Sequence, residues 1–134
     1  IGTKNFTEQY ILARMFEILI ENYSSLVVEV KAGLGGTKIC FDALRQREID
    51  IYPEYTGTSF LTLLNADKQT RDKLIRDKEA VYNYVKKHSL KRHNIVWLKS
   101  LGFNNTYALI MREDDVNEMK LKTISDLKEY LEKQ

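Results

Sequence analysis

Apolar and polar positions follow two different periods along the first half of the chain. The runs Ile1–Thr3, Leu26–Val30 and Ile49–Tyr52 are short, and they are β-branched or alternate with polar residues, which is typical of strands. Between them, apolar residues recur with helical spacing. This β-α-β-α-β-α order predicts an α/β fold with a mostly parallel sheet and helices on both faces.

The first predicted helix follows Asn5-Phe6-Thr7-Glu8, which has the spacing of a capping box. We expect about 16 to 18 residues, buried over more than half the circumference of the helix. Its broad apolar surface comprises Tyr10, Ile11, Leu12, Met15, Phe16, Ile18, Leu19 and Ile20. Further helices are predicted from Lys38 to about Gln46 and from Thr56 to Leu64.

The pattern changes after Asn65, where a mixed-charge surface begins. One or two amphipathic helices are expected between Asn65 and His93. Ile95–Leu98 and Thr106–Met111 have the composition of strands. The segment Thr123-Ile124-Ser125-Asp126 is predicted to cap a last helix, which runs from Leu127 to Lys133.

Size and composition indicate an ordered globular chain. It has 134 residues, 43% of them hydrophobic and 30% charged, and a net charge of +2 gives no overall attraction to nucleic acid. Cys40 is the only cysteine, so an internal disulfide is excluded. No apolar run reaches the roughly 18 to 20 residues that span a bilayer. We expect no signal peptide either, because Ile1–Lys4 has the pattern of the start of a fold.

Three turns that contain glycine or threonine precede helices, at Lys4–Thr7, Gly35–Thr37 and Thr56–Thr58. If the strands are parallel neighbours, these helix N-termini open at one edge of the sheet and together offer an anion site. Ordinary capping of helices that bind nothing is the alternative. Gly33–Gly36 matches neither common phosphate-loop pattern, so we expect a loop with positive φ angles and no nucleotide.

Aromatic residues form the second candidate feature, because Tyr52, Tyr55, Phe103 and Tyr107 lie at or near predicted strand ends. Proteins hold quaternary ammonium groups with π faces, at roughly 0.5 to 2 kcal/mol for each ring. The alternative is that such tyrosines are core rings with solvated hydroxyls, which we favour for Tyr52. Tyr55 and Tyr107 are the better ligand candidates.

No enzymatic or nucleic-acid pattern stands out. The basic run Lys86–His93 lies at a predicted helix C-terminus, where cations complement the helix dipole, and a solvated helix end explains it. Cys40 lies within an amphipathic helix and is expected in the core. Neither histidine has a partner at metal-ligand spacing, and there is no nucleophile elbow. We therefore expect no enzyme, no metal and no cofactor.

Four segments resemble the osmoprotectant substrate-binding proteins of ABC importers, a family that binds glycine betaine, carnitine, choline or proline betaine and has ergothioneine-binding relatives. The resemblance extends from Ile1 to about Leu127. The segments are Lys4-Asn5-Phe6-Thr7-Glu8-Gln9, Gly33-Leu34-Gly35-Gly36-Thr37, Glu48-Ile49-Asp50-Ile51-Tyr52-Pro53-Glu54-Tyr55-Thr56-Gly57-Thr58 and Leu101-Gly102-Phe103-Asn104-Asn105-Thr106-Tyr107-Ala108-Leu109.

The resemblance implies a role for six residues. Tyr55 and Tyr107 would belong to an aromatic cage around the trimethylammonium group. Lys4, Thr37 and Thr58 would lie near the ligand's carboxylate, which agrees with the helix-terminus argument. Asn105 would belong to the same wall of the pocket.

The resemblance also implies a periplasmic-binding-protein type II lobe, one of two that close on the ligand. Residues 1–108 would form the first ligand-binding lobe, and residues 109–134 a crossover strand and the start of a second lobe. The missing second lobe, or another chain, would complete the pocket. Permease subunits would be the membrane partners, at a periplasmic or extracytoplasmic location. The effector-binding domain of a transcriptional regulator, which has a similar fold, is the alternative.

Overall fold

The computed structural model describes residues 1–133, and the chain divides into two compact units, Ile1–Leu101 and Gly102–Gln134. In the first unit the elements are β1 (Gly2–Lys4), α1 (Thr7–Tyr23), β2 (Lys31–Gly35), α2 (Thr37–Arg45), α3 (Thr56–Thr58), the π-helical turn η1 (Ser59–Leu63), α4 (Lys68–Leu74) and α5 (Lys78–His93). The second unit has α6 (Glu113–Met119) and α7 (Ile124–Glu132).

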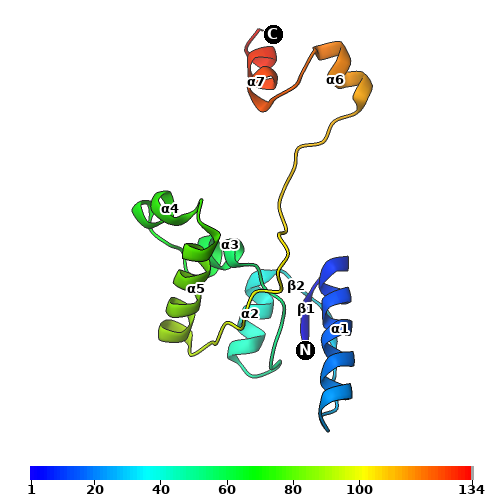
Figure 1. The fold of residues 1–134 in the computed structure, drawn as a ribbon, viewed down its shortest axis with the longest axis vertical. Coiled ribbons are helices and arrows are strands. Elements are labelled where there is room, and N and C mark those ends of the chain that lie inside the picture. The colour runs from blue at the N-terminus through cyan, green and yellow to red at the C-terminus, as the bar shows by residue number, and fades with distance from the viewer. Residues whose placement is uncertain (134) are drawn as a thin grey trace. The chain divides into compact units, whose positions relative to one another are not determined.

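A parallel pair of strands, β1 and β2, lies between α1 and α2 in the first unit (Figure 1). The register pairs Gly2 with Lys31 and Lys4 with Gly35, with an irregularity between them. At that irregularity the Thr3 hydroxyl accepts a hydrogen bond from the Gly33 amide at 2.7 Å. Gly33 has φ +66°, so the predicted positive φ angle is confirmed. The residue lies within β2, however, and not in the predicted loop.

The segment 49–52 lies on the other side of β1. The Gly2 amide donates to the Ile51 carbonyl at 2.9 Å, and Ile49 is buried. A Cβ added at Gly2 would come within 2.4 Å of the end of the Ile49 side chain, so a larger residue here would require that side chain to move. The predicted strand from Ile49 to Tyr52 is nevertheless wrong, because none of these residues is assigned to a strand and Asp50 lies in a bend.

Three other predicted strands are also wrong. Leu26–Val30, Ile95–Leu98 and Thr106–Met111 carry no strand assignment in the part of the chain that the structure describes. Val27 is 94% exposed, and β1 pairs with the residues that follow this run. Composition indicates a preference for extended backbone, whereas a strand also needs a partner for its backbone groups.

Helix α1 begins without the predicted capping box. Its N-cap is Phe6, which has extended backbone and no side-chain cap. The Glu8 carboxylate accepts a hydrogen bond from the Tyr55 hydroxyl instead. The predicted length is confirmed by the 17 residues of α1, but the predicted burial is wrong. Only Gln9, Leu12 and Ala13 are buried, and apolar side chains such as Ile11, at 56%, are exposed. The sheet of this unit is too narrow to cover a wider apolar face.

Helix α5 and the turn η1 enclose the main hydrophobic cluster, which includes Phe60, Leu64, Ala66, Val81 and Val85. Phe60 and Val85 are fully buried, and Leu74, Tyr84 and Trp97 pack around the cluster. The predicted helices at 38–46 and 56–64 are confirmed to within a few residues, and the one or two amphipathic helices expected before His93 are found as two, α4 and α5. This cluster anchors the helix that follows Tyr55.

In the second unit, α7 begins with a complete capping box. The Thr123 hydroxyl accepts from the Asp126 amide at 3.2 Å, and Asp126 Oδ2 accepts from the Thr123 and Lys122 amides, each at 2.8 Å. The predicted cap is thereby confirmed. Among the described residues, no helix has both the length and the apolar character required to cross a membrane.

Replacing Asp126 with Asn is expected to reduce the helicity of α7 at neutral pH. Backbone amides hold the pKa of Asp126 below its ordinary value, so the ionised form is bound more tightly in the folded helix. That contribution is complete above the ordinary Asp pKa of about 3.9 and is lost as the pH falls through the lowered pKa. Circular dichroism should therefore separate the two proteins at pH 7 and show equal helicity in strong acid. An equal difference in helicity at both pH values would show that the ionised form of Asp126 does not stabilise this cap.

Candidate ligand-binding site

The candidate site is formed where segment 49–52 leaves β1 and the chain turns into α3. Pro53 is buried, and Tyr55 is the N-cap of α3, with extended backbone. The Gln9 Nε2 group from α1 donates to the Pro53 carbonyl at 3.1 Å, which fixes this turn against α1. Gln9 is itself fully buried. The turn is therefore held by a buried side chain and not only by its own backbone.

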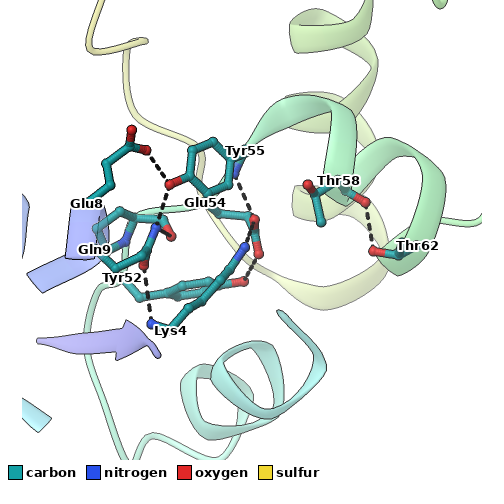
Figure 2. A network of polar contacts seen from close by, with 9 residues as sticks. Lys4, Glu8, Gln9, Tyr52, Glu54, Tyr55, Thr58 and Thr62 are labelled. Atoms are coloured by element: carbon teal, nitrogen blue, oxygen red, sulfur yellow. Dashed lines mark hydrogen bonds and ion pairs between the residues drawn. The ribbon is translucent and has the colours of Figure 1, made fainter. Parts of the chain in front are cut away.

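Side chains from β1 and α1 lie around Tyr55: Lys4 from β1, and Glu8 and Gln9 from α1 (Figure 2). The ring of Phe6 stacks on the Tyr55 ring, with centroids 6.2 Å apart and an interplanar angle of 25°. The Lys4 ammonium lies 4.8 Å from the ring centroid. At the hydroxyl, Tyr55 donates to Glu8 Oε1 and accepts from Gln9 Nε2 at 3.2 Å. The position and orientation of this ring are therefore fixed from several directions.

Lys4 and Glu54 form an ion pair beneath this ring, and each side chain is only 5% exposed. The Glu54 carboxylate also accepts from the Tyr55 amide at 2.7 Å and from the Tyr52 hydroxyl at 3.1 Å. A buried charge is tolerated only with such partners. The pair ties β1 to the Tyr55 turn.

Tyr52 binds the buried carboxylate of Glu54. Burial, followed by the charge of Glu54 and the hydrogen bond to it, strongly raises the pKa of the Tyr52 phenol. The hydroxyl donates to Glu54, whereas the sequence predicted a solvated hydroxyl. Cys40 is fully buried as predicted, and burial raises the pKa of its thiol.

Thr37 and Thr58 lie in separate helices of the same unit. Thr37 is the first residue of α2, whose N-cap, Gly36, has no side-chain hydrogen bond. A Cβ added at Gly36 would meet nothing within 4 Å, so the start of α2 can be approached closely. Thr58 ends α3, and its carbonyl accepts from the Thr62 hydroxyl at 2.7 Å. Gly57 beside it has equally open space.

Comparison with known proteins identifies the family. The profile described as "Substrate binding domain of ABC-type glycine betaine transport system" matches residues 1–134, the whole of the chain. The chain belongs to this family. The resemblance inferred from the four sequence segments is thereby confirmed, and this is a family of substrate-binding domains of transporters.

Individual relatives of this family agree with the profile. The chain is 34% identical over 128 residues to the ergothioneine transport permease/ergothioneine binding protein EgtU of Helicobacter pylori, covering 95% of the chain and 22% of that protein. It is 35% identical over 134 residues to a glycine-betaine-binding protein of Pseudomonas aeruginosa, covering 100% of the chain and 40% of that protein. The chain thus spans less than half the length of these two relatives.

A solved structure supports the fold. The structure of apo YehZ from Escherichia coli superposes with a TM-score of 0.69 at 28% identity, covering 99% of the chain and 46% of YehZ. The predicted α/β class and periplasmic-binding-protein architecture are thereby confirmed. The family match also supports the transport interpretation and not the regulator alternative.

The structure brings some of the six predicted site residues of this family member together. Lys4 and Tyr55 are in direct contact, and Thr58 follows on the helix that Tyr55 begins (Figure 2). Asn105 and Tyr107 belong to the second unit, and the Tyr107 side chain is fully exposed. Their place in a pocket with Tyr55 remains a prediction.

Sequence reasoning missed the role of Glu8, Gln9 and Glu54. The first two were interpreted as the start of a helix, and Glu54 was passed over between two aromatic residues. A signal was present for Glu54 alone, because this carboxylate lies among Tyr52, Pro53 and Tyr55, where a charge needs a partner. Lys4 lies between Thr3 and Asn5, and nothing in this polar setting indicates burial. Only the fold shows which charges meet.

Proposed function

We propose that the chain is part of the solute-binding component of an ABC importer, which captures a quaternary-ammonium compound of the betaine type and delivers it to a membrane permease. Glycine betaine, carnitine, choline and ergothioneine are the candidate ligands. The observation that carries the proposal is the Tyr55 ring, held by Phe6, Glu8 and Gln9 in a chain of this family.

The chemistry of a betaine suits this arrangement. A trimethylammonium group offers no N–H donor, so an aromatic face is its natural partner. The contact between Lys4 and the Tyr55 ring is an intramolecular example of a cation on this face. The ligand's carboxylate would then lie near the start of α2, at Thr37, where backbone N–H groups and the helix dipole favour an anion.

Thr58, Lys4, Asn105 and Tyr107 complete the proposed contacts. Lys4 is the most demanding of these, because its ammonium is nearly buried and already bound to Glu54. An ammonium has three N–H groups, so a second carboxylate can join the first if the ligand reaches the pair. Asn105 and Tyr107 would supply the facing part of the pocket.

The proposed partners follow from the same assignment. Permease subunits would receive the ligand at the extracytoplasmic side of a membrane. Residues 1–108 would act as the first ligand-binding lobe and residues 109–134 as the crossover to a second lobe, which this chain or another one must complete for tight binding. We propose no catalytic activity for the chain.

Calorimetric titration tests the proposal. Glycine betaine, choline, carnitine and ergothioneine would be titrated in turn into this chain and into any longer polypeptide that contains it. Glycine, which lacks the methyl groups, is the matched control. Binding of at least one methylated ligand with no binding of glycine is expected. Equal or absent heats for all five compounds in both proteins would overturn the proposal.

Replacing Gly36 with Ala is expected to weaken glycine betaine binding by roughly two- to thirtyfold, the range expected for an anion at a helix N-terminus. Gly36 has φ −86° and open space around it, so the added methyl group should cost the fold less than about 1 kcal/mol. Choline has no carboxylate, and its affinity should stay the same. An equal loss for both ligands would show that α2 does not face the carboxylate.

A further inference from the structure

The Tyr55 hydroxyl is bound by two side chains of opposite character. Glu8 Oε1 accepts its proton, and Gln9 Nε2 donates to its oxygen at 3.2 Å. Both residues lie in the first turn of α1, which begins at Thr7. The phenol therefore has a defined proton direction, toward a carboxylate. A core tyrosine would need only one neutral partner.

A carboxylate acceptor changes the ring as well as the hydroxyl. A hydrogen bond to an ionised acceptor is shorter and stronger than one between neutral groups, and it draws the phenol proton toward the acceptor. Negative charge then accumulates on the phenol oxygen and on the ring to which it is conjugated. A more electron-rich face attracts a cation more strongly, because the attraction is electrostatic.

Gln9 and Phe6 also hold the ring, so Glu8 is not its only support. Gln9 is fully buried, and its amide binds the Lys4 amide at 3.3 Å and the Pro53 carbonyl at 3.1 Å, as well as the Tyr55 hydroxyl. Phe6 stacks on the ring. Glu8 is only partly buried, and it adds a charge where a neutral acceptor would satisfy the hydroxyl.

We infer that Glu8 determines cation selectivity indirectly, by accepting the hydrogen bond of the Tyr55 hydroxyl and not by touching the ligand. The inference rests on the proposed function and names the residue that makes the Tyr55 ring a site for a positive charge and not only for a methylated group. A site with the same ring but without this carboxylate would discriminate less between a trimethylammonium ligand and an uncharged group of the same shape.

Two ligands of equal shape provide the test. Glycine betaine and 3,3-dimethylbutanoate both carry a carboxylate on a CH₂ group, but the second has a quaternary carbon in place of the quaternary nitrogen. Glu8→Gln, which keeps an acceptor and removes the charge, is expected to weaken glycine betaine binding roughly three- to tenfold and to leave 3,3-dimethylbutanoate binding unchanged. Both affinities would be measured by calorimetry with this chain.

Two further variants separate this role from others. In a Tyr55→Phe background the hydroxyl is absent, so adding Glu8→Gln should no longer change the ratio of the two affinities. Glu17→Gln removes a negative charge from α1 at its ion pair with Arg14, away from Tyr55. The ratio of the two ligand affinities should then be the same as in the unaltered protein. Loss of helix stability alone would lower both affinities together.

The outcomes are distinct. If the unaltered chain binds glycine betaine and Glu8→Gln preserves its preference over 3,3-dimethylbutanoate, the inference is overturned while the proposed function stands. An effect of Glu8→Gln that persists in the Tyr55→Phe background also overturns it, because the carboxylate then acts on the ligand directly. If neither the chain nor a longer polypeptide binds any methylated ammonium compound, both proposals fail.

Discussion

Replacing Lys4 with Met is expected to lower the free energy of unfolding of the first unit by about 3 to 5 kcal/mol. The substitution keeps most of the side-chain volume but leaves the Glu54 carboxylate buried without its counter-ion. Removing one partner of a buried ion pair is costly because the remaining charge has lost its water as well as its partner. Domains of this size have about 5 to 15 kcal/mol of stability in all, so the loss is a large part of it.

The geometry explains why little relief is available. Glu54 is 5% exposed, so solvent reaches it only if the turn before α3 opens. Its other partners, the Tyr55 amide and the Tyr52 hydroxyl, are neutral donors that cannot replace a full positive charge. Opening the turn would in turn disturb the bond between Gln9 and the Pro53 carbonyl.

Urea denaturation followed by the fluorescence of Trp97 measures this effect. Trp97 is the only tryptophan, and it packs against the main hydrophobic cluster of the first unit. The double variant Lys4→Met with Glu54→Gln should recover most of the stability, because the amide oxygen can accept from the Tyr55 backbone amide while the amide NH₂ donates to the Tyr52 hydroxyl oxygen. If the single and double variants unfold at the same urea concentration, the ion pair is not what holds this turn.

Much of the fold was predictable because local pattern determines helices. The apolar spacing in α1, α2 and α5 and the capping box of α7 are short-range features. Strands depend on partners that are distant in sequence, so the β-branched run at Leu26–Val30 was predicted as a strand, although β2 begins only at Lys31.

The candidate site was predictable only in part, for a related reason. An aromatic residue at a strand-to-helix junction is visible in sequence, and this feature led to Tyr55. The residues that hold the ring come from the start of the chain, and Glu8 lies 47 residues from Tyr55. Sequence alone gave Glu8 a local role as a cap, which the fold replaces with a distant one.

Replacing Tyr55 with Ala is expected to weaken binding of betaine-type ligands by roughly three- to thirtyfold, from loss of the aromatic face alone. The loss should be larger if the turn relaxes, because Glu8 and Gln9 lose their shared partner in the same change. Titration of the ligand that binds the unaltered chain most tightly measures the effect. Circular dichroism of each variant establishes that the fold is retained.

Two substitutions of Tyr55 distinguish the effect of its aromatic face from the effect of its side-chain volume. Tyr55→Phe keeps the π face but removes the hydroxyl through which Glu8 acts, so it should lose about as much affinity as Glu8→Gln, roughly three- to tenfold. Tyr55→Leu fills the space without a π face and should behave like the alanine variant. Tyr23→Ala removes a tyrosine that is 86% exposed at the end of α1 and serves as the matched control. If a folded Tyr55→Ala chain binds as tightly as the original, Tyr55 does not hold the ammonium group. The cation would then have to be bound by other aromatic residues, such as Tyr107 in the second unit.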